Sequence, residues 1–188
     1  MRLSRESVDR FFDHNIHIES RTIFIGDGGD DEIDGVIANG VIKAFHLLGE
    51  STDKPIKVFI NSFGGCWFGG MAIYDAIKHC PCEVNAYVIG SAMSMGSVIL
   101  QAADTRVIYP NATLMIHDGY ETRVGDTPQT FANWAEFSKK GREMMYRIYS
   151  GRSGKPVAFW RKKCGSDFIL TSQEAKELGL VDSIYGET

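Results

Sequence analysis

Residues 84–103 constrain the fold more than any other part of the sequence, because these twenty consecutive residues carry no formal charge. A run of this length is long enough to span a bilayer. It also contains several polar side chains, which are Asn85, Ser91, Ser94, Ser97 and Gln101, and the sequence has no second run that resembles a span. We therefore predict a buried strand followed by a packed helix from Met93 onward, and no association with a membrane.

Elsewhere, short β-branched segments alternate with segments of helical periodicity. Strands are predicted at 22–25, 56–60, 106–109 and 113–116, and helices at 31–48 and 70–79. A longer helix is predicted after Thr127, a suitable N-cap, and Pro128. Residues 171–174 match the capping-box pattern, and Gly179 marks the end of the helix that follows. The alternation predicts an α/β fold, and a length of 188 residues favours one domain.

Composition limits the classes of partner. The net charge is −4, with acidic and basic residues interspersed, so we expect no binding to nucleic acid. The four cysteines lack C-x-x-C spacing, which predicts reduced thiols rather than a metal site, and no cofactor motif is evident. The charged N-terminal stretch lacks the apolar core of a secretory signal, and we expect a cytoplasmic protein.

The serines of the uncharged run raise the question of nucleophilic catalysis. A hydroxyl nucleophile needs a base, a group that orients the base, and donors for the developing oxyanion. His117 follows an apolar strand and precedes a glycine turn, and Gly64-Gly65 follows another strand, where backbone N–H groups can face a ligand. The glycines match neither a P-loop nor a dinucleotide fingerprint, and Ser94 lacks the glycine two residues earlier that a hydrolase elbow requires.

Four motifs then occur in order along the chain. They are Ile60-Asn61-Ser62-x-Gly64-Gly65, Gly90-x-Ala92-x-Ser94-Met95-Gly96, Pro110-Asn111 followed by Met115-Ile116-His117, and Asp167-x-x-Leu170-Thr171-x-x-Glu174-Ala175 with Gly179-Leu180-Val181-Asp182. Together they resemble the Clp protease proteolytic subunit family, ClpP. The resemblance implies an α/β chain of the ClpP/crotonase fold, a superhelix of repeated β-β-α units with a protruding handle helix.

The resemblance also implies a serine peptidase site. Ser94 would be the nucleophile, His117 the general base and Asp167 the group that orients the imidazole. The backbone N–H groups of Gly65 and Met95 would form the oxyanion hole. Ser91 and Ser97 are then interpreted as packing or local backbone-bonding residues.

Several positions depart from the family pattern. Phe63 stands where proline is usual and Met93 where alanine is usual, so both, with Gly64, are predicted to shape the substrate groove. Asp118 follows His117 directly, and it competes with Asp167 as the candidate orienting group.

For the whole chain, the resemblance implies a single peptidase domain over 1–188. It would comprise an N-terminal segment at 1–20 and a handle at about 120–150 that joins two stacked heptameric rings. Peptides or unfolded proteins would be the substrates, delivered in the family by a separate AAA+ unfoldase. Lys57 and His79 replace residues that are often aromatic in the family's docking pockets, so a stand-alone or phage-type peptidase is an alternative.

Two further functions remain open. The same fold in the crotonase branch binds acyl-CoA thioesters with paired N–H donors, and that branch does not require Ser94, His117 and Asp167. A catalytically silent ring subunit is the other alternative. Retention of all three residues favours the peptidase.

Overall fold

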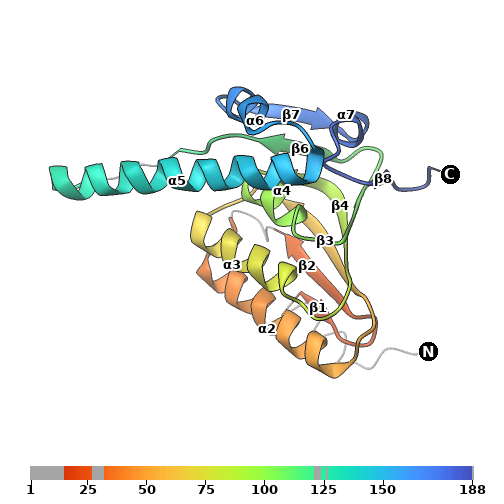
Figure 1. The fold of residues 1–188 in the computed structure, drawn as a ribbon. Coiled ribbons are helices and arrows are strands. Elements are labelled where there is room, and N and C mark those ends of the chain that lie inside the picture. Colours follow the sequence, from red (N-terminus) through yellow and green to blue (C-terminus); the bar gives the residue numbers. More distant parts are fainter. Residues whose placement is uncertain (1–14, 27–31, 121–123, 126, 188) are drawn as a thin grey trace.

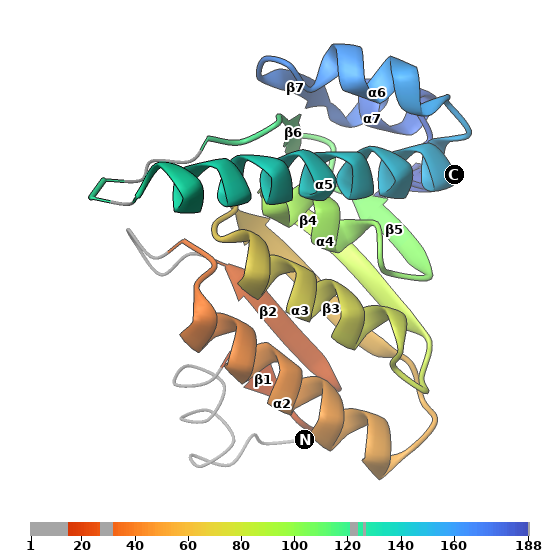
Figure 2. The ribbon, with the colours of Figure 1, turned by 60° about the vertical axis from the view of Figure 1, so that its left-hand side comes forward.

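The structure is a computed structural model that describes residues 15–26, 32–120, 124–125 and 127–187. Its helices are α2 (Gly35–Ser51), α3 (Trp67–Lys78), α4 (Met95–Leu100), α5 (Pro128–Ser153), α6 (Val157–Lys163) and α7 (Ser172–Glu177). Its strands are β1 (Ile16–His17), β2 (Thr22–Gly26), β3 (Ile56–Ser62), β4 (Val84–Met93), β5 (Thr105–Ile108), β6 (Thr113–Ile116), β7 (Phe168–Thr171) and β8 (Ser183–Ile184). Helices α2, α3 and α4 cover one face of the sheet (Figures 1 and 2). The predicted α/β fold is confirmed.

The sheet is mostly parallel, and β4 lies at its centre, where it pairs with β3, β5 and β6. The main order is β1-β2-β3-β4-β5-β8, with β6 paired to both β4 and β7. The first half of β4 pairs with β5, and its last three residues, Ser91 to Met93, pair in parallel with Thr113 to Met115 of β6. Strand β7 then runs antiparallel to β6. One ten-residue strand therefore joins the main sheet to the smaller β6-β7 part.

The uncharged run forms a buried strand and a buried helix, as predicted. Val84, Ala86 and Val88 of β4 have no exposed surface, and the same is true of Val98 and Ile99 in α4. The helix begins at Met95 and not at Met93, because Met93 is still paired with Met115 in the sheet. Among the described helices, none is both long and apolar enough to cross a membrane.

The predicted start of the helix at 31–48 is wrong. Helix α2 begins at Gly35, because the Asp34 carboxylate accepts hydrogen bonds from the N–H groups of Val36 (2.8 Å) and Ile37 (2.9 Å) and so caps the helix. Ile33 lies before the cap and forms a parallel bridge with Gly65. Residue 31 lies outside the described residues.

The predicted start of the next helix, at Gly70, is wrong in the other direction, because it is too late. Helix α3 begins at Trp67, three residues before Gly70, and the Cys66 thiol accepts a hydrogen bond from the N–H of Gly69. The aromatic residues Trp67 and Phe68 therefore belong to the first turn of α3, beside the glycine turn.

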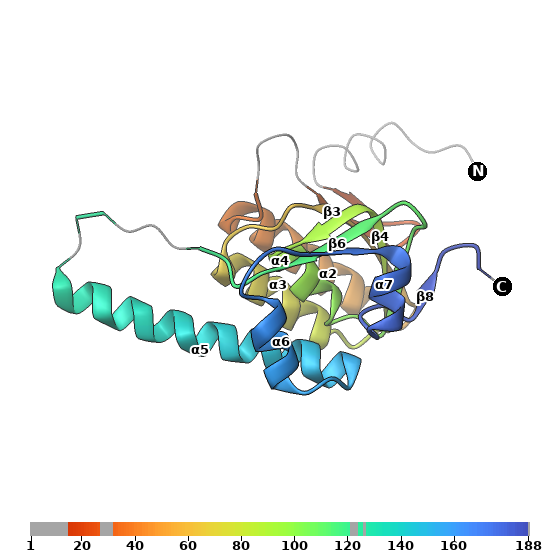
Figure 3. The same ribbon diagram turned by 90° about the horizontal axis from the view of Figure 1, so that it is seen from above.

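Helix α5 follows Thr127, as predicted, and Thr127 caps it by accepting a hydrogen bond from the N–H of Thr130 (3.2 Å). The helix has 26 residues, and its N-terminal part protrudes from the rest of the fold (Figures 1 and 3). The buried residues of α5 are Gly141, Met145, Tyr146 and Tyr149. The C-terminal half of α5 is therefore packed on the body of the protein.

An ion pair between a buried arginine and an exposed aspartate ties the C-terminal segment to the sheet. Arg106 of β5 is 5% exposed and donates to both carboxylate oxygens of Asp182. The same guanidinium donates to the side-chain oxygen of Gln101 at the end of α4 (2.8 Å). This contact links the end of α4 to the segment that leads into β8.

Replacing Asp182 by asparagine (Asp182→Asn) should lower stability in a pH-dependent way. Burial alone raises the pKa of Asp182, but hydrogen bonds and charge from Arg106 outweigh it and hold the pKa below its ordinary value of 3.8. A depressed folded-state pKa stabilises the fold above that ordinary value, and the contribution is lost as the pH falls through the folded pKa. Thermal melts should show the wild type more stable near neutral pH and the two proteins converging below about pH 4. A difference in Tm that stays constant across this range would contradict the assignment.

Candidate active site

The strand register brings three predicted residues to one place. Ser94 follows the end of β4, His117 follows the end of β6, and Asp167 directly precedes β7. The pairing of Met93 with Met115 places Ser94 beside the end of β6. The antiparallel pairing of Ile116 with Phe168 places His117 opposite Asp167.

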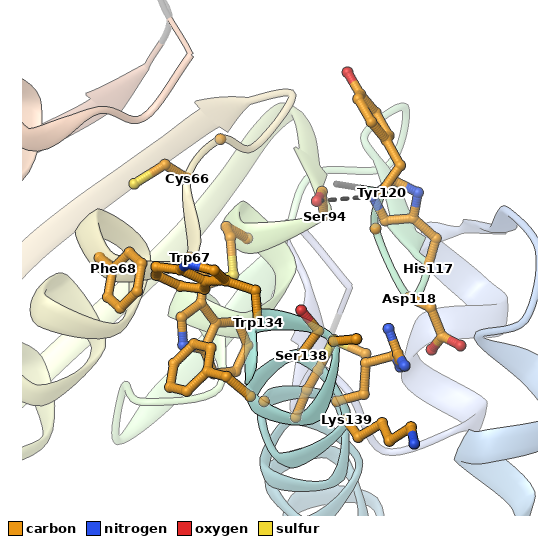
Figure 4. Close-up of a pocket in the computed structure, with 18 of the residues that line it drawn as sticks. Cys66, Trp67, Phe68, Ser94, His117, Asp118, Tyr120, Trp134, Ser138 and Lys139 are labelled. Atoms are coloured by element: carbon orange, nitrogen blue, oxygen red, sulfur yellow. Dashed lines mark hydrogen bonds between the residues drawn. The ribbon is translucent and has the colours of Figure 1, made fainter. Parts of the chain in front are cut away.

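The three side chains form a chain of hydrogen-bonding groups. The Ser94 hydroxyl lies 2.9 Å from His117 Nε2, and His117 Nδ1 lies 3.1 Å from Asp167 Oδ1. The imidazole side chain is 19% exposed, whereas the Asp167 side chain is 64% exposed. Figure 4 shows the hydroxyl directed at the His117 ring. The arrangement can pass a proton from the serine to the imidazole while a carboxylate holds the other ring nitrogen.

The backbone at Ser94 is strained. Its φ of 48° and ψ of −122° lie outside the regions that a non-glycine residue usually adopts. The turn is held because the N–H of Ser94 donates to the carbonyl of Met115 (2.8 Å) while the carbonyl of Ser94 begins α4. A sharp turn between strand and helix thus presents the hydroxyl at the surface of the site.

The glycine turn lies directly against this serine. A methyl group at Gly64 would come within 2.6 Å of Ser94 Cβ and 3.1 Å of the Met95 nitrogen. Gly65 is bridged to Ile33, with Ile33 N donating to Gly64 O and Cys66 N donating to Ile33 O, both at 2.8 Å. The carbonyl of Gly64 and the N–H of Gly65 belong to one trans peptide group and point in opposite directions, so the N–H of Gly65 points away from Ile33.

A cavity of about 670 Å³ opens beside the serine and histidine. Ser94, Met95, His117 and Gly65 line it on one side. The opposite side is aromatic, and Trp67, Phe68 and Trp134 gather there (Figure 4). Phe68 stacks on Phe137 and meets Trp134 edge to face, so α3 and α5 together form this wall.

Asp118 does not contact the imidazole. Its carboxylate accepts a hydrogen bond from the Tyr146 hydroxyl of α5, and its N–H donates to the carbonyl of Cys164. Burial, together with the hydrogen bond to Asp118, raises the pKa of Tyr146. Of the two carboxylates that compete in the sequence, Asp167 is therefore the one that contacts His117.

The predicted groove residues differ in position. Phe63 lines the cavity and is 67% exposed, and Gly64 packs against Ser94. Met93 is the last residue of β4 and is not among the described residues that line the cavity. The sequence interpretation missed Trp67 and Cys66, which line it directly after the paired glycines, because α3 was expected to begin later.

Comparison with known proteins identifies the family. A family model described as Clp protease matches residues 7–188. The chain belongs to the Clp protease family. A relative from Arabidopsis thaliana, ATP-dependent Clp protease proteolytic subunit 3, chloroplastic, is 35% identical over 182 residues. The alignment covers 92% of this chain and 55% of that relative, so the chain spans about half the relative's length.

The family fold is supported by a solved structure as well. A mutant of ClpP1 from Listeria monocytogenes matches with a TM-score of 0.80 and 31% identity, covering 90% of this chain and 94% of that one. The predicted membership of the ClpP family and the predicted α/β fold of the ClpP type are therefore confirmed, whereas the role of α5 as a handle stays a prediction.

Alanine at position 64 (Gly64→Ala) should disturb the site and the fold together. The φ of +110° and the approach to Ser94 both disfavour a side chain there. We expect a loss of about 1–3 kcal/mol in the free energy of unfolding, measured by urea denaturation. Gly40→Ala in α2 is the control, because nothing lies within 4 Å of its added methyl group, and it should be neutral or stabilising by up to about 1 kcal/mol. A Gly64→Ala protein as stable as the wild type would contradict the packing argument.

Proposed function

We propose that this Clp family member is a serine endopeptidase that hydrolyses peptide bonds through Ser94, His117 and Asp167. The observation that carries the proposal is the 2.9 Å approach of the Ser94 hydroxyl to His117 Nε2, with Asp167 on the other ring nitrogen. The strained turn that presents Ser94 supports it further, because strain of this kind clusters at functional sites.

In the proposed acylation step, the Ser94 oxygen attacks the carbonyl carbon of the scissile bond and its proton passes to His117 Nε2. The resulting oxyanion is stabilised by the N–H groups of Gly65 and Met95. The C–N bond then breaks, and the amine leaves with the proton from His117. Water then attacks the acyl-enzyme and gives a proton to His117, the ester bond to Ser94 breaks, and the Ser94 oxygen takes the proton back as the acid is released.

The two oxyanion donors are supported by different features of the backbone. The N–H of Met95 belongs to the first residue of α4, where an N–H group has no acceptor within the helix and carries the positive end of the helix dipole. The N–H of Gly65 is directed away from the bridge with Ile33. Both lie beside the cavity that Ser94 lines.

The proposed substrates are peptides and unfolded proteins, which can enter the cavity as extended chains. We also propose one peptidase domain that assembles into two stacked heptameric rings through α5. Exposed apolar residues on α5 and on the first turn of α3 support this assembly. They are Phe131, Phe137 and Met144 on α5 and Phe68 on α3. A separate AAA+ unfoldase is the proposed partner, and the proposed location is the cytoplasm.

Ser94→Ala should abolish peptide hydrolysis and labelling by a fluorophosphonate, because the attacking oxygen is removed. Mass-spectrometric mapping of the wild-type protein should place the label on Ser94. Ser91→Ala is the matched control, since the Ser91 hydroxyl lies against Asn61 and the carbonyl of Ser62. Labelling of another residue, or hydrolysis that survives in Ser94→Ala, would reject the proposal.

The two carboxylates beside His117 should have unequal effects. Asp167→Asn removes the charge on the residue that contacts Nδ1, and we expect kcat to fall by roughly 10²–10⁴-fold. Asp118→Asn should have a smaller effect, because Asp118 is bound to Tyr146. Steady-state hydrolysis of a fluorogenic peptide compares the two. A larger loss in Asp118→Asn would show that the orienting group has been assigned incorrectly.

A further inference from the structure

A pair of buried hydroxyl groups connects the backbone of Ser94 to helix α5. The Ser97 hydroxyl donates to the carbonyl oxygen of Ser94 at 2.6 Å, and the same hydroxyl lies 2.7 Å from the Tyr149 hydroxyl. Ser97 and Tyr149 have no exposed surface. Water is therefore kept from both groups, and the Tyr149 hydroxyl relies on Ser97 for its hydrogen bond.

The direction of this chain of hydrogen bonds follows from counting protons. A carbonyl oxygen only accepts, and the Ser97 hydroxyl has one proton, which it gives to Ser94. The Ser97 oxygen must therefore accept the proton of Tyr149. Donation runs in one direction, from Tyr149 to Ser97 to the carbonyl of Ser94.

The carbonyl of Ser94 belongs to the same peptide group as the N–H of Met95. A peptide group is planar, and in its trans form the C=O and N–H bonds point in opposite directions. Any contact that fixes the carbonyl therefore also fixes the direction of the Met95 N–H. Hydrogen bonds accepted by a carbonyl additionally polarise the peptide and strengthen its N–H as a donor.

We propose that Ser97 and Tyr149 are positioning residues that aim the Met95 N–H at the oxyanion by holding the opposite end of its peptide group. This inference rests on the proposed peptidase function. The strained ψ of −122° at Ser94 is the angle that sets the direction of this peptide. Ser94 has no side-chain capping bond to α4, and that helix has only six residues. The backbone N–H groups of Ser97 (3.0 Å) and Val98 (3.4 Å) also donate to the Ser94 carbonyl, and the Ser97 hydroxyl, held by Tyr149, adds a third and shorter hydrogen bond at 2.6 Å.

The chain of hydrogen bonds from Tyr149 through Ser97 to the carbonyl of Ser94, called the relay below, also joins the site to α5. Tyr149 lies in the buried C-terminal half of α5, 52 residues from Ser97 along the chain. A displacement of α5 that withdraws the Tyr149 hydroxyl removes the donor from Ser97. The position of the protruding helix is in this way connected to the oxyanion donor and not only to the aromatic wall of the cavity.

The Tyr149 hydroxyl keeps its proton throughout the working range of a histidine base. Burial raises the pKa of Tyr149 far above its usual range. Loss of the hydroxyl should therefore lower the rate without altering the shape of the pH–rate profile.

The test compares Tyr149→Phe, Ser97→Ala and the double variant in peptide hydrolysis. Each single variant should lower kcat on the order of 10-fold with KM unchanged, which is less than the 10²–10³-fold cost of losing a donor outright. The double variant should be no slower than Ser97→Ala, because Tyr149 acts only through Ser97. Binding of a peptide boronate, a tetrahedral transition-state analogue, should weaken in parallel with kcat.

Ser153→Ala is the matched control. Its hydroxyl is on the same helix, donates to the carbonyl of Tyr149 and accepts from the indole N–H of Trp160. It should lower the melting temperature but leave kcat unchanged. If Tyr149→Phe and Ser97→Ala likewise lower only the melting temperature, or if their effects on kcat add, the relay is overturned.

Crystal structures of Ser97→Ala and Tyr149→Phe separate this inference from the proposed function. A Ser94–Met95 peptide turned away from its wild-type direction supports the relay even if the wild-type protein fails to hydrolyse peptides, a result that would reject the peptidase alone. A peptide in the wild-type direction in both variants overturns the relay whatever the activity.

Discussion

The parallel pairing of the last residues of β4 with β6 is the contact on which the site depends. It places the end of one strand, and hence Ser94, beside the end of the other, and hence His117. The N–H of Ser94 donates to Met115 in the same register, so the sheet itself holds the strained turn. A shift of one residue would turn every side chain of the strand to the other face and separate the two groups.

Much of this arrangement could be predicted from the sequence. The absence of charge over residues 84–103 indicated burial, and the structure places this run in the central strand β4 and in the buried helix α4. Local signals were reliable where the interacting groups are close in sequence. Thr127 caps α5, and Thr171 with Glu174 forms a capping box.

Errors arose where a distant segment decides the conformation. Ile33 has the spacing of a helical residue, but its bridge with Gly65 holds it in an extended segment, and Asp34 caps the helix after it. The choice between Asp118 and Asp167 was open because it depends on Tyr146, which lies on α5. The contact between Ser97 and Tyr149 has no sequence signal for the same reason.

Helix α5 thus contributes to the surroundings of the site in three ways. Trp134 and Phe137 line the cavity, Tyr146 holds Asp118 away from the imidazole, and Tyr149 reaches the backbone of Ser94 through Ser97. The groups that would carry out hydrolysis come from strand ends. Their surroundings come largely from a helix whose other half extends from the fold, as Figure 3 shows.

The structure of a phosphonylated protein would show whether Ser94 is the nucleophile and whether two backbone N–H groups form its oxyanion hole, because phosphonate mimics the tetrahedral intermediate. We expect phosphorus bonded to the Ser94 oxygen, with one phosphonyl oxygen about 3 Å from the nitrogens of both Gly65 and Met95. A phosphonyl oxygen directed away from these two nitrogens, or phosphorus bonded to another residue, would contradict it.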